Sequence, residues 1–294
     1  MAETLSDVTI QSWPGPIRTA STPSKPIPKT FSRRWQARIP IDPDNCPFEN
    51  RPQNVAAVHE RPDGDGWKVL ISTTKSEPYH HLIIPQTCKL WPEERTRTLG
   101  GRDKIAEAIE IAARKIRDER LRRAQFSVQI GPLAAQNVAH LHYHLYQLDN
   151  LEGEDILAAT LARYLYEADG LKKLAFFWDD DFIVVAGGHR TGQSLFIPKS
   201  ATPFGPYPSF GPRTADMLAH LVDLYSTKFK SVEGMPPDYR FELSIRDDQI
   251  LFGLFVPVLN QIGTMEDMAL FSPETRRFNL AWSHEETARY LRGE

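Results

Sequence analysis

The sequence predicts an α+β protein made of two copies of one unit, with antiparallel sheets that carry packed helices. Three observations favour this fold class. Strand patterns flank an amphipathic helix, the whole pattern recurs 113 residues further along, and only its first occurrence ends in alternating histidines. A chain of 294 residues is long enough for two units of ordinary domain size. We therefore expect a duplicated architecture in which one copy carries the chemistry.

The first copy is preceded by residues 1–44, whose seven prolines predict an extended arm. The elements predicted beyond the arm are a strand at residues 69–71, a strand at 82–84, a helix at 103–120 and strands at 126–130 and 138–146. The helix is amphipathic because apolar residues recur on one face at helical spacing: Ile105, Ile109, Ala112 and Ile116. These elements make up a first unit, which we expect at residues 45–150.

The repeat places a second unit at residues 151–294, ending in a C-terminal helix. A shift of 113 residues, without gaps, brings residues 82–85 (Leu-Ile-Ile-Pro) onto residues 195–198 (Leu-Phe-Ile-Pro). The same shift brings the apolar helix face onto Leu218, Val222, Tyr225 and Phe229, and Gln136 onto Gln249. It brings the three histidines onto Gly253, Phe255 and Pro257, so the second copy lacks them. Any two strand–helix–strand stretches look alike at this level, but the matched proline and glutamine positions favour duplication.

The composition excludes several classes of protein. The chain is 41% hydrophobic and 25% charged, with a formal net charge of −3, which is typical of a globular protein. Without a basic run, bulk nucleic-acid binding is not expected. We expect no membrane span and no signal peptide. Cys46 and Cys88 are too few for a disulfide scaffold, so we expect a cytoplasmic protein.

The most informative residues are His140, His142 and His144, which alternate with apolar residues. Alternate side chains of a strand share one face, so the three imidazoles would lie together. Neutral imidazoles can bind zinc. An imidazole can also attack phosphorus near neutral pH once a polar group fixes its tautomer. A merely structural cluster is the alternative, but three alternating histidines after a small-residue turn favour a functional site.

The stretch resembles the signature of the histidine-triad (HIT) superfamily, His-x-His-x-His after a Gly/Ala-Gln-x-Val lead-in, here residues 135–138 (Ala-Gln-Asn-Val). Residues 78–86 (Pro-Tyr-His-His-Leu-Ile-Ile-Pro-Gln) resemble the Gly-His-x-Leu-Val-Ile-Pro-Lys strand of the family. The duplication and residues 46–48 (Cys-Pro-Phe) resemble the branch of galactose-1-phosphate uridylyltransferases and diadenosine tetraphosphate phosphorylases. The resemblance covers roughly residues 44–260.

The resemblance implies a nucleotidyltransferase acting on nucleoside 5′-phosphate derivatives, of the nucleotide-sugar or dinucleoside polyphosphate type. His142 would be the nucleophile that forms a nucleotidyl-histidine intermediate, with His140 and His144 beside it. The implied substrate-binding residues are Gln129, Gly131, Gln136, Asn137, Val138 and His80. A nucleotide substrate is the expected partner, and a homodimer is a possible assembly.

Two positions differ from a family pattern, one of which bears on the type of reaction and the other on ribose recognition. His144 stands where the uridylyltransferases have Gln and the hydrolases have His, so a HIT-type nucleotide hydrolase remains an alternative. Ser72 stands where the hydrolases have a ribose-binding Asp. A non-catalytic nucleotide-binding protein is a third hypothesis, because the second copy shows that the architecture persists without its histidines.

A structural zinc is a separate question, because the sequence makes no cofactor certain. Glu49 replaces the second cysteine of the zinc pair of the branch, and Thr87 stands where a His ligand would be. A zinc site of Cys46, Glu49, Cys88 and His140 is chemically permissible. Because this ligand set is irregular, we expect no stoichiometric metal, which elemental analysis of protein purified without chelator would test.

Overall fold

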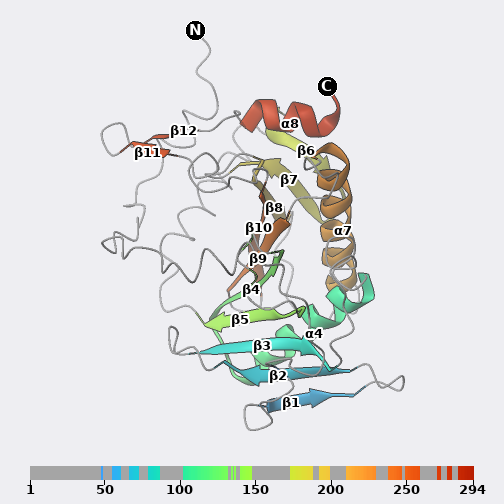
Figure 1. Ribbon diagram of the computed structural model, residues 1–294, viewed down its shortest axis with the longest axis vertical. Helices are drawn as coiled ribbons and strands as arrows, with labels where there is room; N and C mark the ends of the chain where they lie inside the picture. The colour runs from blue at the N-terminus through green and yellow to red at the C-terminus, as the bar shows by residue number, and fades with distance from the viewer. Residues whose placement is uncertain are drawn as a thin grey trace.

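The computed structural model describes residues 48, 55–60, 66–72, 79–86, 102–131, 134, 136, 140–147, 173–187, 192–198, 210–229, 238–246, 249–258, 270–272, 277–279 and 284–294. The arm expected at residues 1–44 lies outside these residues. Within them, ten strands form one antiparallel sheet, accompanied by three helices and a separate two-stranded sheet (Figure 1). The chain therefore has the predicted α+β fold.

The ten strands form two sets with the same order. From one edge to the centre, the first set is β1 (Val55–His59), β2 (Trp67–Ile71), β3 (His80–Pro85), β5 (Tyr143–Gln147) and β4 (Arg123–Ile130). The second set continues with β9 (Asp238–Arg246), β10 (Gln249–Val258), β8 (Ser194–Pro198), β7 (Phe182–Ala186) and β6 (Ala175–Trp178). The small sheet pairs β11 (Leu270–Ser272) with β12 (Arg277–Asn279). Read from its outer edge to the centre of the sheet, each set has the first, second, third, fifth and fourth strand of its copy in that order. The predicted duplication is therefore confirmed.

The helices occupy equivalent places in the two copies. In each copy the helix joins the third strand to the fourth: α4 (Arg102–Asp118) follows β3, and α7 (Phe210–Lys228) follows β8. Both helices lie on one face of the sheet and pack against each other, while α8 (His284–Arg292) lies near β6 (Figure 1). None of these three helices has the length and apolarity needed to cross a membrane. We call the sheet face without α4 and α7 the histidine face.

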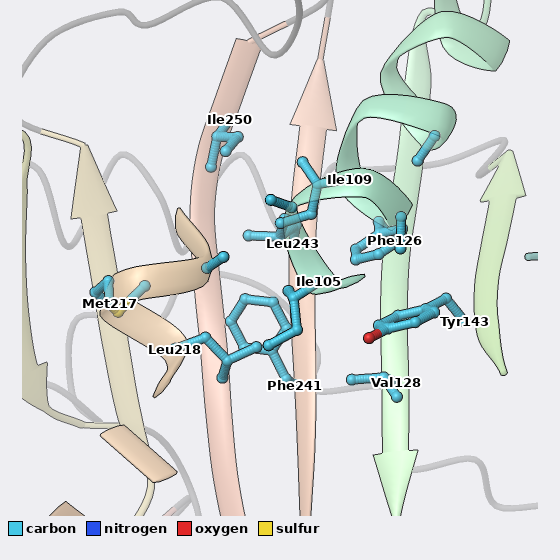
Figure 2. Close-up of a cluster of buried hydrophobic side chains, with 14 of the residues drawn as sticks. Ile105, Ile109, Phe126, Val128, Tyr143, Met217, Leu218, Phe241, Leu243 and Ile250 are labelled. Atoms are coloured by element: carbon cyan, nitrogen blue, oxygen red, sulfur yellow. The ribbon is translucent and has the colours of Figure 1, made fainter. Parts of the chain in front are cut away.

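The face beneath the helices forms a core that both copies share (Figure 2). The predicted apolar stripe of α4 is buried, with Ile105, Ile109, Ala112 and Ile116 each at most 2% exposed. It meets Leu218 and Met217 of α7 over strand residues from both copies, which include Phe126, Val128, Tyr143, Phe241 and Leu243. Burial of this much apolar surface is the main stabilising contribution to the fold.

The two copies are joined through their central strands. β4 pairs with β9 from Arg123↔Arg246 to Ile130↔Tyr239, so the two expected sheets are one continuous sheet. Ser127 pairs with Glu242 near the middle of this junction. Fixed hydrogen bonds therefore hold the histidine face of the first copy in register with the second copy.

The strand register corrects the gapless match for the histidines. Leu82 pairs with His144, whereas its counterpart Leu195 pairs with Leu254 and not with Pro257. The counterpart of His144 is therefore Leu254, and that of His142 is Phe252. The physical reason is the length of one connection: residues 131–142 join β4 to β5, but only residues 247 and 248 join β9 to β10. A single shift of 113 residues cannot hold across connections of such different length.

Candidate functional site

The candidate site is built on β5, which lies between β3 and β4. Tyr143 and Leu145 point into the helix-covered core, so His144 and Tyr146 lie on the histidine face. The strand begins at Tyr143, later than the predicted residue 138, so His140 and His142 precede it. Strand alternation therefore does not place these two rings, and local hydrogen bonds fix the ring of His142 instead.

The ring of His142 is buried and held in one tautomer. Its Nδ1–H donates a 2.7 Å hydrogen bond to the carbonyl of His140, and the residue is only 3% exposed. Burial lowers the pKa of His142 because it disfavours the charged ring, although the hydrogen bond to the His140 carbonyl acts in the opposite direction. With the proton on Nδ1, the lone pair of Nε2 is available to attack an electrophile.

His144 is held by two neighbours through one ring nitrogen. Its Nδ1 lies 2.9 Å from Nε2 of His80 and 3.0 Å from the hydroxyl of Tyr146. The three rings also stack, with centroids 4.2 Å apart for His80 and Tyr146. Because Nδ1 is occupied, the Nε2 atom of His144 is the ring nitrogen left to face a ligand. The ring of His144 lies edge-on to that of His142, with centroids 4.9 Å apart.

The remaining imidazoles are also neutral near pH 7. Burial lowers the pKa of His80 to about 4, with smaller contributions from His81 and His142. Burial likewise lowers the pKa of His140 to about 4, and the neighbouring His142 adds to the effect. The pKa of His144 falls to about 2, mainly through burial. A site with four neutral imidazoles offers nitrogen lone pairs and N–H donors without a net positive charge.

The turn before β5 is fixed by Gly131 and Gln136. The Gly131 N–H donates to Oε1 of Gln136 at 2.8 Å, while Nε2 of Gln136 lies 3.4 Å from the His140 carbonyl. Gly131 has φ of +91°, and a Cβ atom there would collide with Asp238. Gln136 therefore supports the same carbonyl that orients His142, and a glycine is required for the turn.

The other residues expected from the sequence are placed as follows. Gln129 lies on β4 between core residues Val128 and Ile130, so its half-buried side chain belongs to the histidine face. His80 contacts His144 directly. Asn137 and Val138 lie outside the described residues.

Two residues of the site had no assigned role in the sequence. The ring of Phe48 packs edge-on against His140 and His142, with centroids 5.4 Å and 5.3 Å away. The hydroxyl of Tyr146 is the second partner of His144. The spacing of Tyr146, two residues after His144, is the signal that could have found it, because i and i+2 share a strand face. For Phe48, the sequence offers no comparable signal.

The residues proposed for a zinc site are only partly described by the structure, so the expectation about zinc stays a prediction. Cys46, Glu49 and Cys88 lie outside the described residues. His140 is buried and hydrogen-bonded to the carbonyl of Pro85. Among the residues that the structure does describe, no group of three or more His, Cys, Asp or Glu side chains is arranged to hold a metal ion.

Comparisons with known proteins identify the fold. No protein-family model and no curated protein matches the chain. Among solved structures, an ADP-glucose phosphorylase from Arabidopsis thaliana with bound ADP-glucose is similar, with a TM-score of 0.59 and 16% identity over 85% of this chain and 90% of that one. A GalT-like protein from Arabidopsis thaliana has a TM-score of 0.58 and 16% identity, over 84% of this chain and 91% of that one.

A structure named as a uridylyltransferase is also similar, with a TM-score of 0.54 and 16% identity over 78% of this chain and 85% of that one. At such low identity these likenesses show a shared fold. The fold is the one that the resemblance to the HIT superfamily implied.

Proposed function

We propose that the protein is a nucleotidyltransferase that acts on nucleoside 5′-phosphate derivatives through a nucleotidyl intermediate on His142. The observation that carries the proposal is the 2.7 Å hydrogen bond from Nδ1 of the buried His142 to the His140 carbonyl. It fixes the ring in one tautomer with Nε2 free to act as a nucleophile, while burial of the ring favours its neutral form. The roles of the individual residues below belong to this proposal.

The reaction takes place in two displacements. In the first, Nε2 of His142 forms a bond to the 5′-phosphorus while the bond to the leaving group breaks. The ring then carries a positive charge, and the Nδ1–H bond to the His140 carbonyl becomes a stronger, charge-assisted hydrogen bond. In the second, an acceptor oxygen attacks the same phosphorus and the electron pair returns to Nε2. Each displacement is easier than a direct transfer between two bound substrates.

The neighbouring side chains stabilise the phosphoryl group in both displacements. His144 and Gln129 would donate N–H groups to its oxygens, with Nδ1 of His144 held by His80 and Tyr146. Asn137 and Val138, which the resemblance implies as substrate-binding residues, would contact the same group, and Gly131 has the positive φ that its turn needs. Gln136 acts indirectly, through the carbonyl that orients His142.

The comparisons support a nucleotide substrate. The similar Arabidopsis structure is described as a phosphorylase with bound ADP-glucose, and another similar structure as a uridylyltransferase. Both descriptions are consistent with a nucleoside diphosphate derivative as the substrate. A nucleotide hydrolase is the second candidate, favoured by the imidazole at His144, which stands where the uridylyltransferases have a glutamine. A non-catalytic nucleotide-binding protein is the third.

The mass of the intact protein tests the proposal. After mixing with nucleotide sugars, dinucleoside polyphosphates or nucleoside 5′-phosphoramidates, wild-type protein should gain the mass of one nucleoside monophosphate less water. His142→Asn should bind the same nucleotides without gaining mass. The adduct is a phosphoramidate, so it should be lost in acid and kept in base. Turnover of a nucleotide by His142→Asn at the wild-type rate would exclude this mechanism.

A further inference from the structure

The second copy contributes a charged pair to the histidine face. On β9, Tyr239, Phe241 and Leu243 point into the core, so Arg240 and Glu242 lie on the opposite face. Nε of Arg240 lies 2.5 Å from Oε1 of Glu242. The second copy lacks the three histidines, but it places a cation on the sheet face that carries the histidines of the first copy.

The register puts this cation close to the histidines. Arg240 pairs with Gln129 of β4. Val128 is the last residue of β4 that pairs with β5, opposite Tyr143, and His142 directly precedes Tyr143 in the chain. Two strand spacings, about 10 Å, therefore separate the backbones of His142 and Arg240. A phosphate adjacent to the one attacked by His142 would lie between these two side chains.

The pairing of Arg240 leaves it suited to bind an anion. The Glu242 side chain is 11% exposed, while that of Arg240 is 40% exposed. A guanidinium has five N–H donors in a planar fork, so contact through Nε leaves its terminal nitrogens able to bind phosphate in a bidentate manner. The carboxylate of Glu242 holds the arginine by charge attraction, as an ion pair through Nε.

We propose that Arg240 binds the phosphate of the group that leaves in the first displacement and accepts in the second. This inference rests on the proposed function and makes it more specific: the acceptor is inorganic phosphate or a phosphate ester, rather than water. With inorganic phosphate, one anionic oxygen forms the new P–O bond as the bond between phosphorus and Nε2 of His142 breaks. The electron pair returns to Nε2, and a nucleoside diphosphate is released.

The test separates loading of the protein from its discharge. A nucleoside 5′-phosphoramidate has an uncharged leaving group: its nitrogen takes up a proton from solvent and departs as ammonia when Nε2 of His142 bonds to phosphorus. Loading from this compound should not require Arg240. The loaded protein is then mixed with inorganic phosphate or with buffer alone, and loss of the adduct and formation of nucleoside diphosphate are followed by mass.

We expect Arg240→Gln to load normally, to discharge into water at the wild-type rate and to discharge into phosphate about 10- to 100-fold more slowly. Arg240→Lys should recover part of the rate because it restores the charge without the planar fork. Because Arg240→Gln leaves Glu242 buried without its partner, the double variant Arg240→Gln, Glu242→Gln serves as a second test and should show the same selective loss. The matched control is Arg246→Gln, on the same strand about 20 Å away, which should discharge like wild type.

Two results would overturn the inference: wild-type discharge into phosphate by both glutamine variants, or equal losses of discharge into water and phosphate. Failure of the wild-type protein to load at all would instead count against the proposed function.

Discussion

The two copies present the same sheet face with opposite chemistry. In the first copy, His142 and His144 lie on this face. In the second, the corresponding positions hold Phe252 and Leu254. Phe252 is 2% exposed and packs in a small apolar cluster with Ala175, Val185 and Leu195, here called the second-copy cluster. The fold therefore does not need imidazoles at these positions, since apolar side chains fill them well.

The difference between the copies indicates that buried histidines lower the stability of the fold. A buried neutral imidazole contributes less hydrophobic stabilisation than Phe or Leu and must satisfy its polar nitrogens. In the first copy the histidines form two separate hydrogen-bonded pairs, His80 with His144 and the ring of His142 with the His140 carbonyl. Polar groups retained where apolar ones would fit are typical of a functional site.

At one pair of positions on the other face, the two copies differ in which strand carries the aromatic ring. Ile83 pairs with Tyr143 in the first copy, whereas Phe196 pairs with Gly253 in the second. A Cβ atom at Gly253 would overlap the Phe196 ring, so the ring occupies the space above the glycine. The core volume is thus kept while its sequence changes, which allows low sequence similarity between the copies.

The largest difference is expected from matched substitutions at His142 and Phe252. His142→Asn removes the nucleophile and should lower turnover of a nucleotide substrate by about 10⁴-fold or more. Phe252→Leu, at the equivalent position, should leave turnover per folded molecule unchanged. Steady-state rates with protein of verified fold provide the measurement. Similar losses of turnover from both substitutions would contradict the proposal that only the first copy carries the reactive residues.

Substitutions in the second copy should instead lower the stability of the protein and leave the chemistry at His142 intact. Phe252→Ala removes a buried aromatic ring from the second-copy cluster and should lower the free energy of unfolding by about 3–5 kcal/mol. Urea unfolding followed by fluorescence measures this value. The folded fraction of the variant should still form the adduct on His142. A folded variant that could not form it would show that the second-copy cluster also shapes the site.

Acid should destabilise the first copy selectively. Unfolded histidines bind protons below pH 6.5, whereas His80 and His140 stay neutral in the folded protein until about pH 4. The unfolded state therefore binds more protons in this window. The stabilisation is complete above pH 6.5 and is lost as the pH falls, by up to about 1.4 kcal/mol per pH unit for each histidine.

Unfolding measured at several pH values between 7.5 and 5 tests this expectation. His80→Gln introduces the residue found at the equivalent position of the second copy, Gln193, and should make the pH dependence shallower. An unchanged slope in this variant would mean that His80 does not contribute to the acid sensitivity.

The smallest effect is expected at Tyr146. Tyr146→Phe removes the hydroxyl next to Nδ1 of His144 and should slow turnover about 3- to 10-fold, as expected for the loss of one hydrogen bond. Tyr143→Phe, on the same strand but facing the core, is the matched control and should have no effect on the rate. Equal rates for wild type and Tyr146→Phe would show that His80 alone suffices to orient His144.

Much of the fold could be predicted from local patterns. The apolar stripe of α4 follows from helical spacing, and the strands at 69–71 and 82–84 fall within β2 and β3. The start of β5 could not be predicted, because the alternating pattern of residues 138–146 does not show that the strand begins only at Tyr143. Alternation predicts a shared face only where a strand exists.

The site was only partly predictable for a related reason. His142 and its neighbours are adjacent in the sequence, so the pattern indicated them directly. Arg240 reaches the same face through the pairing of β4 with β9, across more than a hundred residues. The apolar–polar alternation of residues 238–246 indicates a strand with one polar face, but not which strand lies beside it.

The pairing of β4 with β9 also has a consequence for assembly. These strands are equivalent in the two copies, and Ser127 and Glu242, which pair with each other, stand at their equivalent centres. A chain ending after β5 would expose the hydrogen-bonding edge of β4. In the full chain this edge pairs with β9, the equivalent of β4, so a second β4 strand would fit it. Two such fragments could pair β4 with β4 around a true twofold axis and carry two sets of histidines. Duplication within one chain replaces that dimer, which leaves one half free to change its residues while the other keeps the reactive ring.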